Sequence, residues 1–291
     1  MKKTEHRIFF VVACLLLLLA FGTTIVQYHS QKTSLNDLST GLLAPQKSGQ
    51  PGIMILSYRR ILKPSLSTSL LTLKSSEEFH RYLNTTRNLK KQLAYLRAHH
   101  VRIISLEEAL SLIRKRRPLH HQYVVLTVDG ADQTIYDNWL PIMRQQQLPF
   151  TIFVTTGSLG DYQNAVKMMS WKQLQKLFAT GLATVGSKTD SMNFLVDNYP
   201  ALTAVDFNSL QLDFQKSIQK IKRHLHVSVR YFAYPFGYYN QDYQKTLVKD
   251  NFITFSLKNR IITSKSSLSQ PLPRISVDKE NWNNVITKWI H

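Results

Sequence analysis

Short apolar runs of strand length alternate with amphipathic segments of helical length along most of this chain. The run YVVLTV (residues 123–128) precedes a helical segment at residues 134–146, and a second run, FTIFVTTG (residues 150–157), follows it. Strands this apolar are buried on both faces, which is typical of parallel strands covered by helices. The repeated strand–helix order therefore predicts an α/β domain with a mostly parallel sheet.

The same alternation extends from residue 51 to the C-terminus. Further strands are expected at residues 52–58, 182–187, 231–237 and 252–258. Helices are expected at residues 89–100, 105–117, 170–181, 202–225, 239–251 and 281–291. Barrel enzymes built from such units carry their functional residues at the C-terminal ends of the strands. Four candidate residues lie near such ends: Asp129, Ser187, Tyr234 and Arg274.

The N-terminus carries an uncharged apolar run of 19 residues, IFFVVACLLLLLAFGTTIV (residues 8–26), preceded by Lys2, Lys3 and Arg7. A membrane-spanning helix needs about 20 apolar residues, and basic residues before it favour a cytoplasmic N-terminus. A cleaved signal peptide has a shorter apolar region, about 7–15 residues, and an A-x-A-like cleavage site. No convincing site of this kind follows Ala20, so we favour an uncleaved anchor.

These features divide the chain into three parts. Residues 1–28 are expected to form a cytoplasmic stub and a membrane anchor, or a signal segment. Residues 29–50 form a tether, and residues 51–291 form the folded domain. The protein is then a single-pass protein of the cell membrane whose domain lies outside the cell, or a secreted protein if the first segment is cleaved.

Charge and cysteine content narrow the choice of partners. The chain has 37 Lys and Arg against 18 Asp and Glu, a formal charge of +19, which favours anionic partners such as a membrane or a cell-wall polymer. The basic residues are scattered and no nucleic-acid motif is recognisable, so a nucleic-acid partner is not expected. The single cysteine, Cys14, lies in the apolar run, and the exported part therefore has no disulfide.

Three stretches resemble motifs of the polysaccharide deacetylase (NodB-homology) family, in the right order. They are VVLTVDGADQTIYDNWLPIMRQQQLPFTIFVTTG (residues 124–157), FAYPFG (residues 232–237) and PLPRI (residues 271–275). Within this family, the sequence resembles the exported poly-β-1,6-N-acetylglucosamine N-deacetylases of the intercellular adhesin type. The resemblance covers residue 51 to the C-terminus. It implies a distorted (β/α) barrel and a surface polysaccharide, the biofilm polymer poly-N-acetylglucosamine, as partner.

The resemblance also implies a metal-dependent reaction whose residues are partly missing. In the family, a divalent metal, often zinc, binds one aspartate and two histidines, and a neighbouring aspartate acts as base on the metal-bound water. Asp129 matches the base and Gly130 matches the metal-binding aspartate; a shift of one residue would instead make Asp129 the ligand. The two histidines, five residues apart in this branch, correspond to Ser187 and Met192. Neither residue type suits zinc, so we expect no bound metal unless activity with zinc, cobalt or nickel is retained.

Other site residues are implied by the same family motifs. Arg274 matches an arginine that orients the catalytic aspartate. A substrate groove with aromatic faces would be formed by Tyr58, Tyr234, Pro235, Phe236 and Gly237. Asp132 and Asp190 could supply oxygen ligands to a weak substitute cation site, or could cap a helix and a loop instead. Exposed positions, rather than metal ligation, are expected for His80, His99, His100, His120, His121, His224 and His226.

Three functions follow from these expectations. The first is a deacetylase-family protein that binds surface poly-N-acetylglucosamine without the usual metal-dependent catalysis, alone or with an exopolysaccharide synthase complex. The second is an active N-deacetylase of a β-linked N-acetylglucosamine polymer. The third is a basic module for anionic cell-wall polymer. The missing ligands favour the first, and restoring Gly130→Asp, Ser187→His and Met192→His together is expected to create zinc binding.

Overall fold

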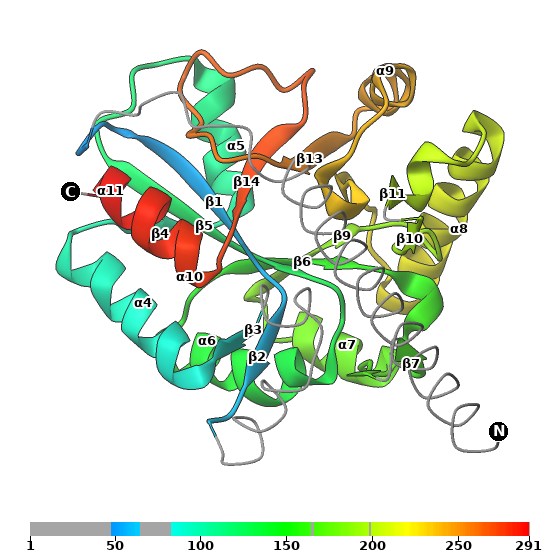
Figure 1. Cartoon of the computed structure of the whole chain (residues 1–291), viewed down its shortest axis with the longest axis horizontal. Helices are drawn as coiled ribbons and strands as arrows, with labels where there is room; N and C mark the ends of the chain where they lie inside the picture. The colour runs from blue at the N-terminus through cyan, green and yellow to red at the C-terminus, as the bar shows by residue number, and fades with distance from the viewer. Residues whose placement is uncertain (1–47, 65–82, 164–165, 198, 291) are drawn as a thin grey trace, which may run out of the picture.

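Parallel strands form the centre of the computed structural model, which describes residues 48–64, 83–163, 166–197 and 199–290 (Figure 1). The main sheet comprises β1 (Gly52–Tyr58), β4 (Arg102–Ile104), β5 (Gln122–Asp129), β6 (Phe150–Val154), β9 (Ala183–Ser187), β12 (Tyr231–Ala233), β13 (Ile253–Leu257) and β14 (Leu272–Ser276). Their order is β1-β14-β13-β12-β9-β6-β5-β4, and β5 also pairs with β1. The described strands other than β4 therefore close into a barrel.

Strand β5 explains how β4 remains outside the barrel. One edge of β5 pairs with β1 along Gln122–Val128. The other edge pairs first with β4 at Tyr123–Val125 and then with β6 at Thr127–Asp129. The expected barrel is thus confirmed. Asp129, the last residue of β5, lies beside β6 at the C-terminal end of the strands.

Helices surround the barrel (Figure 1). They are α4 (Thr86–Ala98), α5 (Leu106–Lys115), α6 (Leu140–Gln146), α7 (Trp171–Phe178), α8 (Phe207–Leu225), α9 (Gln241–Lys249), α10 (Lys279–Asn281) and α11 (Thr287–Ile290). Serine side chains cap the N-termini of two of these helices. Ser105 accepts a hydrogen bond from the Glu108 N–H at 3.1 Å before α5, and Ser170 forms a reciprocal capping box with Gln173 before α7. The serine pattern therefore marks where these helices start.

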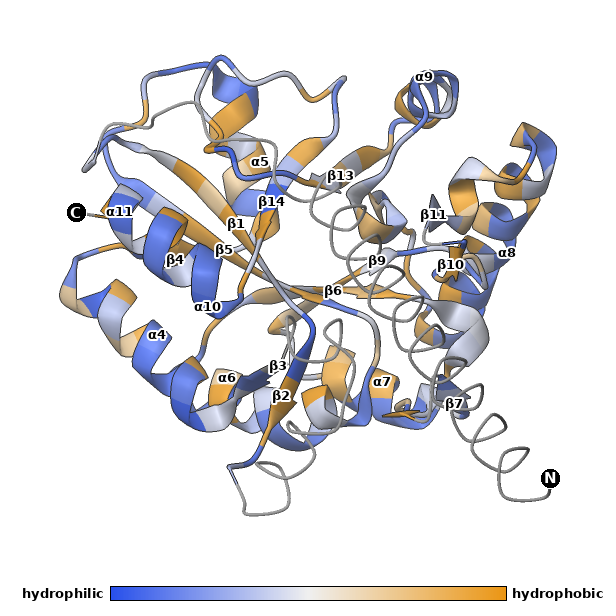
Figure 2. Cartoon of the chain, in the orientation of Figure 1, coloured by the Kyte–Doolittle hydropathy of each residue, from blue (hydrophilic) through white to orange (hydrophobic). Residues whose placement is uncertain are grey.

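Most residues of the barrel strands are hydrophobic (Figure 2) and buried. In β1, Ile53 and Ile55 belong to a cluster that also contains Phe153 and Phe255, whereas Met54 and Leu56 belong to a second cluster. Successive side chains of a strand point to opposite faces, so the first cluster fills the barrel interior and the second lies under the helices. This double burial explains the uninterrupted apolar runs in the sequence.

Several short elements were not expected from the sequence. They are β4, β2 (Arg60–Leu62), β3 (Leu83–Thr85), β7 (Tyr162–Gln163), β8 (Val166–Lys167), β10 (Leu195–Val196) and β11 (Tyr199–Pro200). The five-residue barrel strand β14 was not among the expected strands either. Strands of two or three residues are too short to show a period. The helix expected at residues 134–146 begins as a π-helical turn, Ile135–Trp139, and α8 begins later than expected because Asp206 caps it.

The anchor and most of the tether, together with His80, lie outside the described residues. In the part of the chain that the structure describes, no helix is both long and apolar enough to cross a membrane. The membrane anchor at residues 8–26 therefore stays a prediction.

Candidate functional site

A buried ion pair closes the C-terminal end of the barrel interior. In β5, Asp129 lies two residues beyond Thr127 on the interior face, and β14 directs Arg274 to the same space from the other side of β1. Arg274 Nη1 donates to Asp129 Oδ1 at 2.5 Å, and Nη2 donates to Oδ2 at 3.1 Å. The Arg274 side chain is 0% exposed and lies 4.8 Å above the ring of Phe153. Arg274 thus holds the carboxylate in a fixed orientation.

Lys188 brings a second cation to the same carboxylate. Its Nζ donates to Asp129 Oδ2 at 2.6 Å, and its side chain is 7% exposed. The Lys188 N–H donates to the Val154 carbonyl at 2.9 Å, one residue beyond the end of β9. Because this bond continues the pairing with β6, the lysine side chain is held over the end of the barrel.

The two cations keep Asp129 ionised. Burial alone would raise the pKa of the Asp129 carboxyl, but the charges and hydrogen bonds of Arg274 and Lys188 outweigh it and hold this pKa well below its ordinary value. Burial lowers the pKa of Lys188 to about 8, although Asp129 partly opposes that shift. At neutral pH Lys188 is still mostly protonated. Two cations and one carboxylate then give this cluster one net positive charge.

A small cavity opens onto the cluster. Its volume is ≈ 30 Å³, and it is lined by Ser57, Arg59, Asp129, Lys188, Asn193, Phe236, Leu257 and Ser276. By this measure one water needs about 10–15 Å³. The cavity therefore has room for a water molecule or the end of a small group, and a sugar ring would have to lie at its mouth.

Of the aromatic residues expected to line a groove, Phe236 lines this cavity. Tyr58 is 1% exposed; its hydroxyl donates to Gln92 at 3.1 Å and its ring contacts Trp139. Tyr58 follows the interior-facing Ser57 and so points to the outer face of β1, where the helices cover it. The structure therefore places Tyr58 in the core, and Tyr58 does not line the Asp129 cavity.

Tyr234 also differs from expectation. It is 1% exposed, and its hydroxyl donates to Gln244 at 2.9 Å. Pro235 is buried beside it, and the turn then passes through Phe236 at φ 55° and Gly237 at φ 77°. A Cβ on Gly237 would lie 2.4 Å from the Leu257 nitrogen, so the glycine allows this close approach. The turn serves the site by presenting Phe236.

The site residues predicted in the loop after β9 differ by one residue from those that face the cavity in the structure. Ser187 is fully buried and its Oγ is 2.8 Å from the Ser217 Oγ of α8, and Met192 packs beside the apolar cluster that contains Phe214. Lys188 and Asn193 line the cavity in their place.

The spacing in the sequence could not reveal this register. Ser187 and Met192 are five residues apart, and so are Lys188 and Asn193. The alternation of β9 could have done so. Val185 belongs to the cluster under the helices, so Ser187 shares that outer face, whereas Gly186 and Lys188 face the interior. Lys188 and Asn193 are thus functional candidates that the sequence reasoning missed.

Asp190 holds this loop in place. Its carboxylate accepts hydrogen bonds from the Thr156 hydroxyl at 2.6 Å and from Lys220 at 2.7 Å, and it pairs with Lys216 at 2.9 Å. Asp213 of α8 in turn accepts the Asp190 N–H at 2.7 Å. Asp190 is therefore committed to anchoring the loop and does not line the cavity.

Asp132 is committed in a similar way. Its carboxylate accepts from Arg60 Nε at 2.6 Å and from the Thr134 N–H at 2.7 Å, which caps the following helical turn. The structure does not bring Asp132, Asp190 and Asp129 together around one point, and no group of three His, Cys, Asp or Glu side chains among the described residues could hold a metal. A substitute cation site built on these aspartates is not formed.

The residues around Asp129 do not fit the family's metal. Both oxygens of Asp129 already accept hydrogen bonds from cations, Gly130 has no side chain, and Asn193 offers a neutral amide. A divalent ion would also be repelled by two adjacent positive charges. These side chains therefore suit a bound molecule that accepts hydrogen bonds. They do not suit a metal ion, which needs anionic side chains around it.

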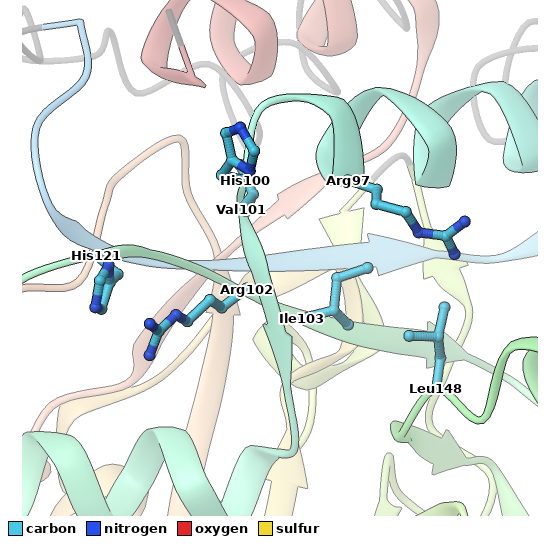
Figure 3. A pocket seen from close by; sticks show the side chains of 7 residues that line it. All are labelled: Arg97, His100, Val101, Arg102, Ile103, His121 and Leu148. Carbon is cyan, nitrogen blue, oxygen red and sulfur yellow. The ribbon is translucent and has the colours of Figure 1, made fainter.

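A second cavity, ≈ 520 Å³ in volume, lies at the N-terminal ends of β4 and β5, opposite the Asp129 cavity. It is lined by Arg97, His100, Val101, Arg102, Ile103, His121 and Leu148 (Figure 3). Arg97 Nη2 donates to Gln146 Oε1 at 2.9 Å. Neither Arg97 nor Arg102 forms an ion pair with any carboxylate in the described ranges. We call this second cavity the basic cavity.

The structure thus combines a closed parallel barrel with a carboxylate that an arginine holds at the C-terminal ends of the strands. The sequence profile described as Polysaccharide deacetylase matches residues 116–253, so this part of the chain is a domain of the polysaccharide deacetylase family. Within it, the chain is similar to poly-β-1,6-N-acetyl-D-glucosamine N-deacetylases. The Staphylococcus epidermidis protein is 26% identical over 288 residues, which is 97% of this chain and 96% of that protein. A Staphylococcus aureus protein of the same name is 27% identical over 240 residues, 81% and 82% of the two chains.

Solved structures agree with this assignment. The structure of IcaB from Ammonifex degensii superposes with a TM-score of 0.70 at 25% identity, and the match covers 84% of this chain and 99% of that one. The Streptococcus pyogenes deacetylase PplD superposes with a TM-score of 0.66 at 18% identity, covering 82% and 99%, and so shares the fold. The resemblance seen in the sequence motifs is confirmed.

Proposed function

We propose that this protein binds poly-β-1,6-N-acetylglucosamine outside the cell membrane through the Asp129 cavity, without metal-dependent removal of acetyl groups. The observation that carries the proposal is the Lys188 ammonium on the Asp129 carboxylate, 2.6 Å from Oδ2. The similar staphylococcal proteins are named for this polymer. The apolar run at residues 8–26 supports a position at the membrane, where an exopolysaccharide synthase complex is an expected partner.

The state of Asp129 supports a loss of the family's usual reaction. A general base works best when its pKa lies near the operating pH, and the pKa of Asp129 is held far below that range. Water without a metal is a weak nucleophile at neutral pH. A single positioned carboxylate contributes only ~10²–10⁴-fold to such a reaction. Binding of the polymer therefore fits this site better than its hydrolysis.

The test measures binding and acetate release with the same oligomer. The full-length chain in detergent is titrated with an N-acetylated β-1,6-glucosamine hexamer, and acetate is followed with added zinc, cobalt or nickel and with a chelator. We expect saturable binding that the chelator does not change, and no acetate release above the protein-free rate. Metal-dependent acetate release would overturn the proposal in favour of an active N-deacetylase, and absence of binding would remove the polymer as ligand.

The basic cavity favours a second candidate function, binding of an anionic cell-wall polymer. Arg97 and Arg102 both line one open cavity, and arginine binds phosphate well because its planar fork donates two parallel hydrogen bonds. The charge of +19 would add long-range attraction for such a polymer. This cavity and the Asp129 cavity lie at opposite ends of β5, so the two ligands would not compete.

Replacing Arg97 and Arg102 together with methionine is expected to weaken binding of a glycerol-phosphate oligomer by about tenfold at low salt. The measurement is a calorimetric titration at two ionic strengths. Arg87→Met, an exposed arginine on the same helix as Arg97, is the matched control and should leave the affinity unchanged. Equal weakening by the control would mean that the overall charge, rather than the basic cavity, attracts the oligomer.

A further inference from the structure

The Lys188 side chain lines the Asp129 cavity, and two of its hydrogen-bond donors have no acceptor among the described residues. An ammonium carries three N–H donors. One donates to Asp129 Oδ2, and no other described atom accepts from the remaining two. The side chain is nevertheless 7% exposed and lines the cavity. A buried cation in this state is stabilised by an acceptor oxygen placed in the cavity.

The shape and charge of the cavity narrow the choice of acceptor. Its ≈ 30 Å³ admits the end of a small group rather than a ring. Asn193 supplies a polar amide near Lys188, and Phe236 and Leu257 supply apolar surface. An acetamido group matches this lining, because its carbonyl oxygen accepts hydrogen bonds while its methyl group needs apolar contact.

The same cluster opposes a free amino group. Asp129 is the one carboxylate among the residues that line this cavity, and both of its oxygens are taken by Lys188 and Arg274. A glucosamine ammonium would bring another positive charge to a cluster that already has one in excess. It would also offer no acceptor to Lys188.

We propose that the Lys188 ammonium binds the carbonyl oxygen of an N-acetyl group, so that the protein is a receptor selective for N-acetylated over de-N-acetylated polyglucosamine. The selectivity rests on the proposed function, since it requires this polymer as the ligand. The acetamido oxygen then accepts a hydrogen bond from the positively charged Lys188 side chain. The protein distinguishes the polymer before deacetylation from the polymer after it.

The experiment compares two β-1,6-glucosamine hexamers, one fully N-acetylated and one fully de-N-acetylated, by calorimetric titration of the full-length chain in detergent. We expect the acetylated hexamer to bind at least about tenfold more tightly. Lys188→Met keeps the length and apolar stem of the side chain and removes its charge. It should weaken binding of the acetylated hexamer by about tenfold or more and reduce the preference between the two hexamers. Lys172→Met, at an exposed lysine of α7, is the matched control.

The outcomes separate the two proposals. Absence of binding to either hexamer by the unmodified protein would overturn the polymer-binding function. Equal binding of both hexamers by the unmodified protein would overturn the selectivity alone, and this comparison needs no variant. An unchanged preference in a folded Lys188→Met variant would likewise overturn the role of Lys188. A thermal unfolding curve of that variant establishes that it is folded.

Discussion

Arg274→Leu is expected to lower the free energy of unfolding by about 3–5 kcal/mol, because it leaves a buried carboxylate without its main partner. Arg274 is 0% exposed and makes both hydrogen bonds of a bidentate pair with Asp129. Lys188 keeps one contact with that carboxylate, which places the expected loss toward the lower end of the range. The loss is measured by urea-induced unfolding, followed by tryptophan fluorescence.

Two comparisons make this result specific to the buried pair. Arg223→Leu, at an exposed arginine of α8, should change the free energy of unfolding by no more than about 0.5 kcal/mol. Asp129→Asn preserves the shape of the side chain and should cost at least as much as Arg274→Leu, since two buried cations then lose their shared anion. A loss below about 1 kcal/mol for Arg274→Leu would contradict the buried pair as a main support of the barrel end.

The triple variant Gly130→Asp, Lys188→His and Asn193→His is expected to bind one zinc ion per chain, with a dissociation constant of about 1 μM or tighter, about −8 kcal/mol. The substitutions remove the Lys188 cation from Asp129 and supply an aspartate and two imidazoles, a ligand set that suits zinc. A Cβ at Gly130 meets no atom within 4 Å, so there is space for the new carboxylate. The φ of 81° there costs of order 1 kcal/mol for a residue other than glycine.

A zinc titration by calorimetry checks this result, with the rise in melting temperature on adding zinc as a second measurement. The control is the set first suggested by the sequence, Gly130→Asp, Ser187→His and Met192→His. It should bind no zinc, because Ser187 is fully buried and faces Ser217 of α8 rather than the cavity. Zinc binding by the control set and not by the Lys188 set would show that the register of the loop after β9 is wrong.

The sequence was sufficient for the fold because burial on both faces leaves a clear mark. The strand at Gly52–Tyr58 has the expected bounds, and the repeated units predicted the parallel strands, whereas the barrel was implied by the family resemblance. Family motifs also identified Asp129 and Arg274, which the structure joins across 145 positions of the chain. Long-range pairing of this kind follows from the order of strands, and the order was implied by the family rather than by any local pattern.

The residues facing the cavity were harder to predict because one residue of register reverses the direction of a side chain. Ser187 and Lys188 fit the motif spacing equally well, and only the parity of β9 separates them. Tyr58 and Tyr234 were predicted to line an aromatic groove, yet both point to the outer face of the barrel. A buried lysine beside an aspartate also gives no sequence signal of its own, since lysine is ordinarily a surface residue.

The position of Lys188 has a consequence for how the site responds to its surroundings. A metal ion occupies a protein according to its concentration, so a metal-loaded site empties when the ion is withdrawn. The cation on Asp129 is instead part of the polypeptide, and it is in place whenever the chain is folded. This protein would then still bind the polymer in an environment depleted of zinc, where a metal-dependent relative would lose its activity.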